Sequence, residues 1–134
     1  MTAFALKIVT PDGLIYDGQA EELIIRTVTG DIGIMAGHVD CVAPLGMGQA
    51  MFVINGVKKY AACIGGMLSM LGGQATLVPT TFEWSDQIDK SRSHASELRA
   101  RAVLADKTSA DTDIRLAEAR LKRALIRQSV AEKK

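Results

Sequence analysis

Apolar residues recur at every second position near the start of the chain, which is the period of a β-strand. Phe4, Leu6 and Ile8 carry the pattern, and Pro11-Asp12-Gly13 follows as a turn because proline presets φ and glycine permits a positive φ. Asn55-Gly56 is a stronger hairpin signal. Further strand candidates are residues 14–16, 23–28, 32–35, 50–54, 57–62, 67–71 and 75–78. Many short strands at this spacing predict an antiparallel sandwich or barrel.

Glycine and proline divide the chain into two parts. All 12 glycines and all 3 prolines lie at or before Pro79, and neither occurs from Thr80 to Lys134. The second part is instead rich in Ala, Arg, Leu, Glu and Lys, which favour helices. The sequence therefore predicts an α+β fold (β then α). An N-terminal antiparallel β-sandwich occupies residues 1–84, and a C-terminal α-helical hairpin occupies residues 85–134.

Two helices are expected in the second part. Ser85 or Asp86 is the predicted N-cap of a helix that runs to about Ala105. Residues 106–111 form a short connection, and Thr112 or Asp113 caps a second helix that runs to about residue 130. A connection this short favours an antiparallel pair.

On a helical wheel the second helix shows two stripes. The apolar stripe consists of Ile114, Ala117, Leu121, Ala124 and Leu125. The basic stripe, roughly 120° away, consists of Arg120, Arg123 and Arg127. Either the basic stripe is a solvated face, as most runs of charge are, or it is directed at an anionic ligand or partner.

The first helix mixes arginines with its apolar positions. Ile88, Ala95 and Ala102 define a weak apolar stripe, and Arg92 and Arg99 are expected inside it. A desolvated, unpaired arginine is costly, so these side chains either extend to solvent along their own methylenes or face an anion between the helices.

The second alternative brings four arginines together. With Arg123 and Arg127 on the facing helix, Arg92 and Arg99 would complete a set of guanidinium groups around one phosphate group. Fork-shaped guanidinium groups suit phosphate oxygens. Both alternatives remain open from the pattern alone.

Charge is distributed unevenly between the two parts. Residues 1–84 hold 4 basic and 7 acidic residues, and residues 85–134 hold 12 basic and 8 acidic ones, within a total of +1. The basic helical part suggests an acidic protein surface or a phosphate-bearing ligand as its partner. Few aromatic residues and a near-neutral total argue against nucleic acid as a partner.

No set of residues with catalytic spacing is found. Cys41 and Cys63 are expected to be buried thiols, without zinc-type spacing, and His38 is expected to be a loop residue. Gly46-Met47-Gly48 lacks the third glycine and the following helix of a dinucleotide-binding motif. Neither a signal peptide nor an apolar run of ~20 residues is visible, so no transmembrane segment is expected. A stand-alone β-sandwich enzyme or ligand-binding module is the alternative from another class.

Four segments, in order along the whole chain, resemble the epsilon subunits of bacterial F-type ATP synthases. They are Val9–Gly13, Gly30–His38, Ile64–Leu68 and Ala119–Ala124. Ala36 and Asp40 stand where the family usually has proline.

The resemblance implies a non-catalytic rotor subunit in the central stalk of a proton-translocating ATP synthase. Its β-sandwich would pack on the gamma subunit and the c-ring. Its hairpin would either fold onto the sandwich or extend along gamma, where its basic residues approach the beta subunits and block ATP hydrolysis. It would be a peripheral subunit on the cytoplasmic face of the bacterial membrane.

The resemblance also implies a regulatory ATP site, with no catalytic cofactor. Residues 88–93, Ile-Asp-Lys-Ser-Arg-Ser, are similar to the I/L-D-x-x-R-A motif by which some members bind ATP, with serine replacing the last alanine. In that comparison the carboxylates of Glu83 and Asp89 serve the adenine end of ATP or orient the arginines. The arginines hold the phosphates. The implied nucleotide-binding residues are Glu83, Ile88, Asp89, Arg92, Ser93, Arg99, Arg123 and Arg127. The alternative is the same subunit without a functional ATP site, acting only as a structural and inhibitory element.

Overall fold

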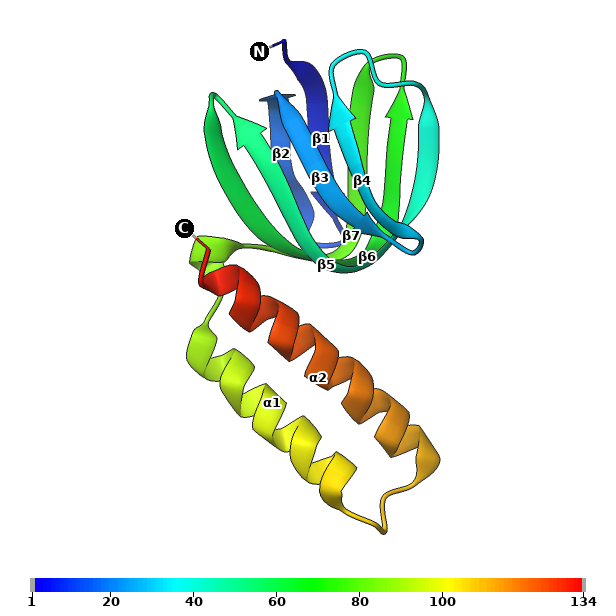
Figure 1. Ribbon diagram of the computed structural model, residues 1–134, viewed down its shortest axis with the longest axis vertical. Helices are drawn as coiled ribbons and strands as arrows, with labels where there is room; N and C mark the ends of the chain where they lie inside the picture. Colours follow the sequence, from blue (N-terminus) through cyan, green and yellow to red (C-terminus); the bar gives the residue numbers. More distant parts are fainter. Residues whose placement is uncertain (1, 134) are drawn as a thin grey trace. The chain divides into compact units, whose positions relative to one another are not determined.

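The computed structural model describes residues 2–133, and the chain divides into two units, Met1–Trp84 and Ser85–Lys134. Strands make up the first unit and helices the second (Figure 1). The predicted order of a β-sandwich followed by a helical hairpin is confirmed.

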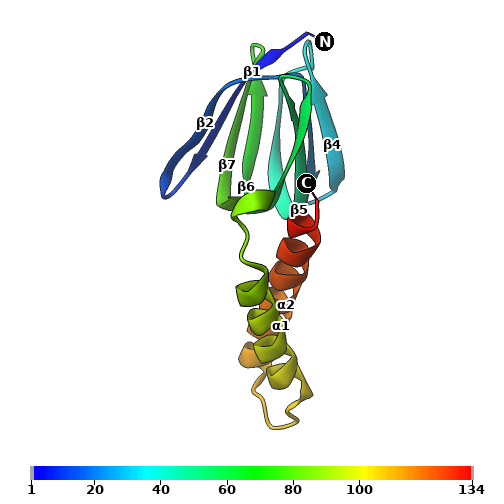
Figure 2. The ribbon, with the colours of Figure 1, turned by 90° about the vertical axis from the view of Figure 1, so that its left-hand side faces the viewer.

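Seven strands form the first unit, joined in the order β2-β1-β7-β6-β5-β3-β4. They curve around a common interior (Figure 2). Neighbouring strands are antiparallel except β1 and β7, which pair in parallel. The prediction of an all-antiparallel sheet was therefore wrong at this pair. The strands are β1 Phe4–Thr10, β2 Gly13–Ala20, β3 Glu22–Thr27, β4 Gly30–Met35, β5 Cys41–Ile54, β6 Val57–Leu71 and β7 Gln74–Trp84.

The core of this unit follows the two-residue period of its strands. Phe4, Leu6 and Ile8 of β1 are almost fully buried, since alternate side chains of a strand point to one face. Phe52 is fully buried, and its ring meets those of Phe82 and Trp84 in edge-to-face contacts. Cys63 belongs to the same core.

The β5–β6 turn is fixed from a distant part of the chain. Asn55 and Gly56 both have positive φ, as a two-residue hairpin turn requires. The Glu21 carboxylate accepts hydrogen bonds from the backbone N–H groups of Asn55 at 3.2 Å and Gly56 at 2.8 Å. One acidic side chain between β2 and β3 thus holds the turn against the sheet.

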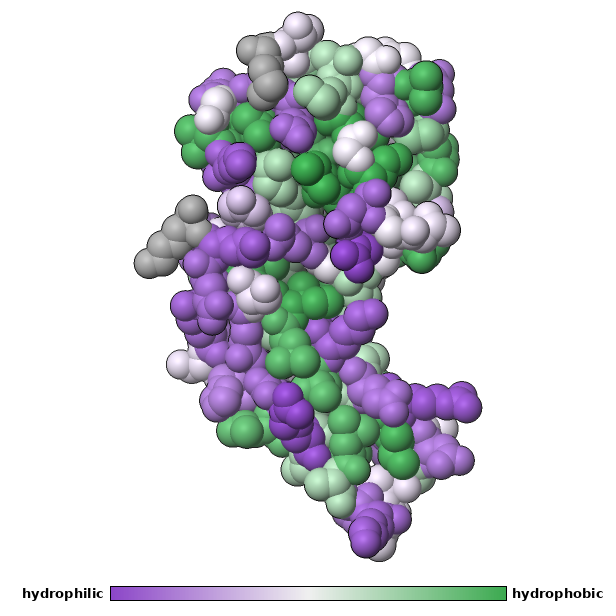
Figure 3. Space-filling model, viewed as in Figure 1, coloured by the Kyte–Doolittle hydropathy of each residue, from purple (hydrophilic) through white to green (hydrophobic). Residues whose placement is uncertain are grey.

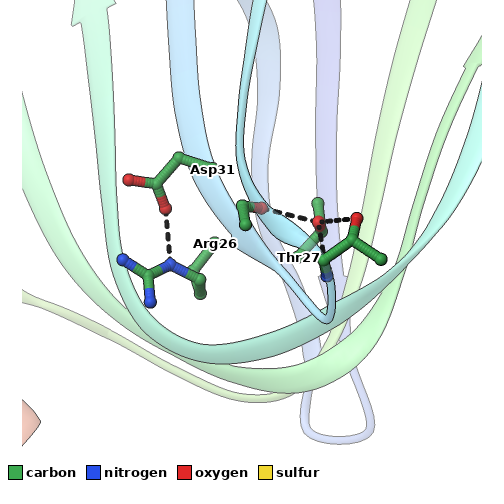
Figure 4. A network of polar contacts seen from close by, with 5 residues as sticks. Arg26, Thr27 and Asp31 are labelled. Carbon is green, nitrogen blue, oxygen red and sulfur yellow. Dashed lines mark hydrogen bonds and ion pairs between the residues drawn. The ribbon is translucent and has the colours of Figure 1, made fainter.

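Polar contacts also hold the β3–β4 turn (Figure 4). Arg26 Nε donates to Asp31 Oδ1 at 2.6 Å, and Thr27 Oγ1 donates to the Gly30 carbonyl at 2.6 Å. The pairing of β3 with β5 shifts register beside Arg26. A Cβ on Gly48 would lie 2.8 Å from the Arg26 Cβ, so the Gly46–Gly48 segment serves a close approach of two strands.

The helical unit consists of the 3₁₀ turn η1 Ser85–Gln87 and the helices α1 Lys90–Ala105 and α2 Asp111–Ala131. The predicted start of the first helix at Ser85 or Asp86 was wrong, because that segment forms the separate turn. Asp89 is the N-cap instead, and its carboxylate accepts the Arg92 N–H at 3.0 Å. The second helix starts slightly earlier than predicted and ends one residue later.

Small side chains occupy the interface between α1 and α2. The buried residues are Ser93 and Ala100 on α1, and Ala117, Ala124, Val130 and Ala131 on α2. On α2 the predicted stripe is confirmed at Ala117 and Ala124, whereas Ile114 and Leu121 are half-buried and Leu125 is 42% exposed. On α1 the expected stripe was wrong: Ala102 is exposed and Ile88 precedes the helix. The packed face is rotated toward Ser93 and Ala100. Residue type does not distinguish the two faces, because positions 95 and 102 are alanines as well.

Candidate anion-binding groove

A groove of about 530 Å³ runs along the helical hairpin, and all the side chains that line it belong to the helical unit. Four of them are arginines: Arg99 of α1, and Arg120, Arg123 and Arg127 of α2. Positions 120, 123 and 127 are spaced by three and four residues, so their side chains emerge on one side of α2. The groove therefore collects positive charge from both helices.

These arginines are only partly balanced by nearby carboxylates. Within residues 2–133, no hydrogen bond or ion pair engages the guanidinium groups of Arg99, Arg120 or Arg123. Arg123 and Arg127 are half-buried, whereas Arg99 and Arg120 are exposed. Guanidinium groups gathered in a partly desolvated groove favour an anion with several oxygens.

The structure brings together three of the eight residues implied by the resemblance, Arg99, Arg123 and Arg127. Arg92 is exposed and does not line the groove, so Arg92 and Arg99 flank the helix interface instead of lying within it. Ser93 is 5% exposed and belongs to that interface.

The other three residues have different surroundings. The Asp89 carboxylate caps α1, and Ile88 is half-buried just before that cap. Glu83 is half-buried in β7, which belongs to the first unit.

Arg120 is a groove arginine that the expected set omits. The sequence did indicate this residue, because the spacing of positions 120, 123 and 127 places all three arginines in one basic stripe. The set of four arginines was built from the helical wheel and was matched by the resemblance, and Arg120 was left out of both. Ser96, Val103, Ser109, Asp113 and Leu116 line the groove as well and were not expected there.

A polar link joins the two helices beside the groove. Gln128 Nε2 of α2 donates to Glu97 Oε1 of α1 at 2.9 Å, and Arg101 Nε donates to Glu97 Oε2 at 2.7 Å. The hydrogen bond from Gln128, and then that from Arg101, lower the pKa of the Glu97 carboxyl. The Gln128 bond links the two helices, and the Arg101 bond, which lies within α1, fixes the Glu97 carboxylate that receives it.

The cysteines, His38 and Asp40 are of types that often serve catalysis, but their contacts here are structural. Cys41 and Cys63 are free thiols, and burial raises the pKa of Cys63 to about 12. His38 lies in the β4–β5 loop with its Nδ1 2.7 Å from the Val39 carbonyl oxygen. Asp40 accepts the Gly72 N–H at 2.9 Å and so supports the β6–β7 turn.

No metal cluster or membrane-spanning helix is found over the described range. Residues 2–133 hold no group of three or more His, Cys, Asp or Glu side chains placed to bind a metal ion. In that same range no helix is both long and apolar enough to cross a bilayer.

Known proteins share both units of this chain. Residues 3–85 match the family of the ATP synthase delta/epsilon chain β-sandwich domain. The ATP synthase epsilon chain of Bacillus velezensis is 41% identical over 98% of this chain and 98% of its own length. The epsilon chain of Shouchella clausii is 34% identical over 100% of this chain and 98% of its own length.

Solved structures show the same fold. A chain of the Euglena gracilis mitochondrial ATP synthase, from a structure of OSCP, F1 and c-ring, superposes with a TM-score of 0.84 at 20% identity. The match covers 96% of this chain and 81% of the Euglena chain. Since the sandwich matches the family model and bacterial relatives align over the full length, the chain belongs to the ATP synthase delta/epsilon family, as a non-catalytic epsilon-type subunit.

Proposed function

We propose that this subunit turns with the central stalk of a bacterial proton-translocating F-type ATP synthase and restrains ATP hydrolysis through its helical hairpin. ATP bound to the folded hairpin is the regulatory signal. The groove lined by Arg99, Arg120, Arg123 and Arg127 is the observation that carries this proposal. A triphosphate is the ligand that best matches four guanidinium groups.

Contacts of the β-sandwich with the gamma subunit and the c-ring are part of the same proposal. Val28, Val39 and Val42 are each more than half exposed, at 62%, 75% and 59%. Apolar side chains exposed in this way support a protein partner. The complex would lie on the cytoplasmic face of the bacterial membrane, with this chain as a peripheral component.

The hairpin suits a switch because its interface is small. Apart from Val130, the buried residues of the two helices are alanines and one serine, so the folded contacts bury little apolar area. The extended form of the hairpin directs its basic residues at acidic segments of the beta subunits. Its free energy then differs from that of the folded form by only a few kcal/mol. ATP at roughly a hundredfold excess over its Kd would stabilise the folded form by about 2.7 kcal/mol.

The phosphate end of the site is assigned to the groove arginines. Ile88, Asp89, Arg92, Ser93 and Glu83 remain proposed members of the site through the resemblance. Arg92 is close in sequence to the helix start, and its guanidinium would have to reach the ligand from outside the groove.

Calorimetric titration of the intact chain with ATP tests the proposal. We expect saturable binding that Arg123→Ala weakens at least tenfold, the loss of about 1.4 kcal/mol that one charge-assisted contact represents. Arg115→Ala is the matched control, because Arg115 is an exposed arginine of α2 outside the groove. Equal loss in both variants, or no binding up to millimolar ATP, contradicts a specific site.

A second candidate is the same subunit without a functional ATP site. One observation favours it: Asp89 and Arg92, at the centre of the ATP-motif resemblance, do not line the groove. The groove arginines would then serve contacts with the beta or gamma subunits. Absence of ATP binding, together with weaker inhibition of hydrolysis by Arg123→Ala in the assembled complex, would identify this case.

A further inference from the structure

We propose that the hydrogen bond between Glu97 and Gln128 selects the face of α1 that packs on α2, and that this selection places Arg99 in the groove. Glu97 and Gln128 are positioning residues, because neither lines the groove itself. The selection of the face concerns the hairpin alone, whereas its consequence for ligand binding rests on the proposed ATP site.

α1 carries two faces of small residues. Ser93 and Ala100, which are buried, are seven residues apart, and so are Ala95 and Ala102. The second pair is displaced from the first by two positions, which is about 200° on a helix with 3.6 residues per turn. The two pairs therefore lie on opposite sides of α1, and each is small enough for a close approach of the helix backbones.

Burial of apolar area does not decide between the two faces. Leu98 is 54% exposed and lies on the side of α1 that carries Ala95 and Ala102. Figure 3 shows apolar side chains at the surface of the helical unit as a green band, bordered by hydrophilic ones. Packing the Leu98 side on α2 would have covered more apolar surface than packing the side with Ser93. A polar contact must therefore distinguish the faces.

Glu97 supplies that contact. Its Oε1 accepts a hydrogen bond from Gln128 Nε2 of α2 at 2.9 Å, and its side chain is 14% exposed. Arg101 Nε donates to Oε2 at 2.7 Å from within α1 and so fixes the carboxylate. If Ala95 and Ala102 were packed instead, Glu97 would face solvent and Gln128 would lose this acceptor. Hydrogen bonds to a charged group are among the stronger ones in proteins, so the observed face is favoured.

The same bond sets the position of Arg99. Positions 97 and 99 are two residues apart, so their side chains leave α1 toward opposite edges of the interface. With Glu97 held against Gln128 at one edge, Arg99 lies at the other edge, where it lines the groove with the arginines of α2. Turning Ala95 and Ala102 into the interface would carry Arg99 away from those arginines.

A polar pair of this kind acts through specificity more than through stability. Where apolar packing leaves several arrangements close in free energy, one hydrogen-bonded polar contact excludes the others. The alanine-rich interface of α1 and α2 is such a case. Breaking the pair should therefore change the packed face, and not merely loosen the hairpin.

Thiol labelling of the intact chain reports which face is packed. In a Cys41→Ser background, Ala102→Cys places a thiol on the exposed side of α1, while the native Cys63 is buried. We expect rapid alkylation of this new thiol while the bond between Glu97 and Gln128 is intact. Gln128→Glu sets two carboxylates against each other, and we expect it to slow the alkylation at least threefold as position 102 turns toward α2.

Two further variants separate the pair from its charge. Ser129→Glu adds the same charge at the next position of α2, which is exposed, and should leave the alkylation rapid. Glu97→Gln added to Gln128→Glu exchanges the two side chains, so that an amide again donates to a carboxylate between the helices. We expect this exchange to restore rapid alkylation.

Calorimetric titration with ATP measures the consequence for Arg99. Arg99→Ala should weaken ATP binding about tenfold in the wild-type chain, and Gln128→Glu alone should weaken it to a similar extent. In the Gln128→Glu background, Arg99→Ala should weaken binding less than twofold further, because Arg99 has already left the groove. Such non-additivity between residues on opposite edges of the interface shows that one positions the other.

Each outcome bears on a different step. Alkylation that stays rapid in Gln128→Glu overturns the selection of the face, even if the helix amides lose protection from hydrogen exchange. Slowed alkylation combined with an equal effect of Arg99→Ala in both backgrounds overturns the positioning of Arg99. If the wild-type chain does not bind ATP, the proposed function and the role of Arg99 fail together, and the alkylation result still decides the selection of the face.

Discussion

Enlarging one buried alanine between the helices should open the folded hairpin. Ala124 is fully buried, and α2 packs mainly against α1. Ala124→Leu adds three carbon atoms at a position with no free surface. The opposing helix contributes Ser93 and Ala100, whose short side chains have no room to rearrange, so the helices must separate.

The expected cost follows from that geometry. Overpacking of a closely packed interface costs about 1–3 kcal/mol. A loss of one or two kcal/mol lowers the ratio of folded to open hairpin by about 5–30-fold. If the groove is the proposed ATP site, apparent ATP affinity should fall in proportion to the folded fraction, because the groove requires both helices.

Hydrogen exchange followed by mass spectrometry on the intact chain measures this directly. Protection of α1 and α2 amides should fall in Ala124→Leu while protection of the β-strands is retained. Ala102→Leu is the matched control, since Ala102 is exposed on α1 and leucine is tolerated in helices. Equal helix protection in the two variants would refute the argument that tight alanine packing sets the stability of the hairpin.

Three further outcomes follow from individual contacts. Glu21→Ala should lower the free energy of unfolding in urea by about 1–2 kcal/mol, because two turn N–H groups lose a charged acceptor, while the exposed Asp17→Ala should change it little. The pKa of Glu97 is lower in the folded state, so its contribution to helix stability is present above the unfolded pKa and lost as pH falls through the folded one. Thermal melts of Glu97→Gln at decreasing pH should therefore lack that part of the pH dependence. A loss of stability at low pH equal to that of the wild-type chain would contradict this. Cys63 should resist iodoacetamide at neutral pH while the half-exposed Cys41 is modified, and faster labelling of Cys63 by mass spectrometry would be inconsistent with its burial and raised pKa.

The sandwich was predictable from sequence where local rules decide the structure. The alternation of Phe4, Leu6 and Ile8 reports directly on one buried strand face, and Asn55-Gly56 specifies a turn through its positive φ angles. The parallel contact of β1 with β7 was not predictable in this way. It joins residues about seventy positions apart, and no local pattern records which distant strands become neighbours.

The sequence correctly predicted that the second unit is a helical hairpin. It did not predict which face of α1 packs against α2. Apolar content pointed to Ala95 and Ala102, while the interface uses Ser93 and Ala100. Hydrophobicity misses this because Ala95, Ala100 and Ala102 are the same residue type and Ser93 is less apolar than any of them. A rotation of the face by a fraction of a turn then decides whether Arg92 lines the groove or stands outside it.

The same small residues explain why arginines line a groove at the edge of the helix interface. Alanines bring the two helix backbones close, so long side chains cannot enter the interface and must stand along its edge. Arg99, Arg120, Arg123 and Arg127 stand along one such edge, where like charges repel each other. The interface itself gains little apolar burial with which to offset that repulsion. An anion in the groove would replace repulsion by charge-assisted hydrogen bonds in the folded form alone, since opening the hairpin separates Arg99 from the arginines of α2. Anion binding in the groove would in this way be coupled to the stability of the folded hairpin, through the placement of alanine and arginine on the two helices.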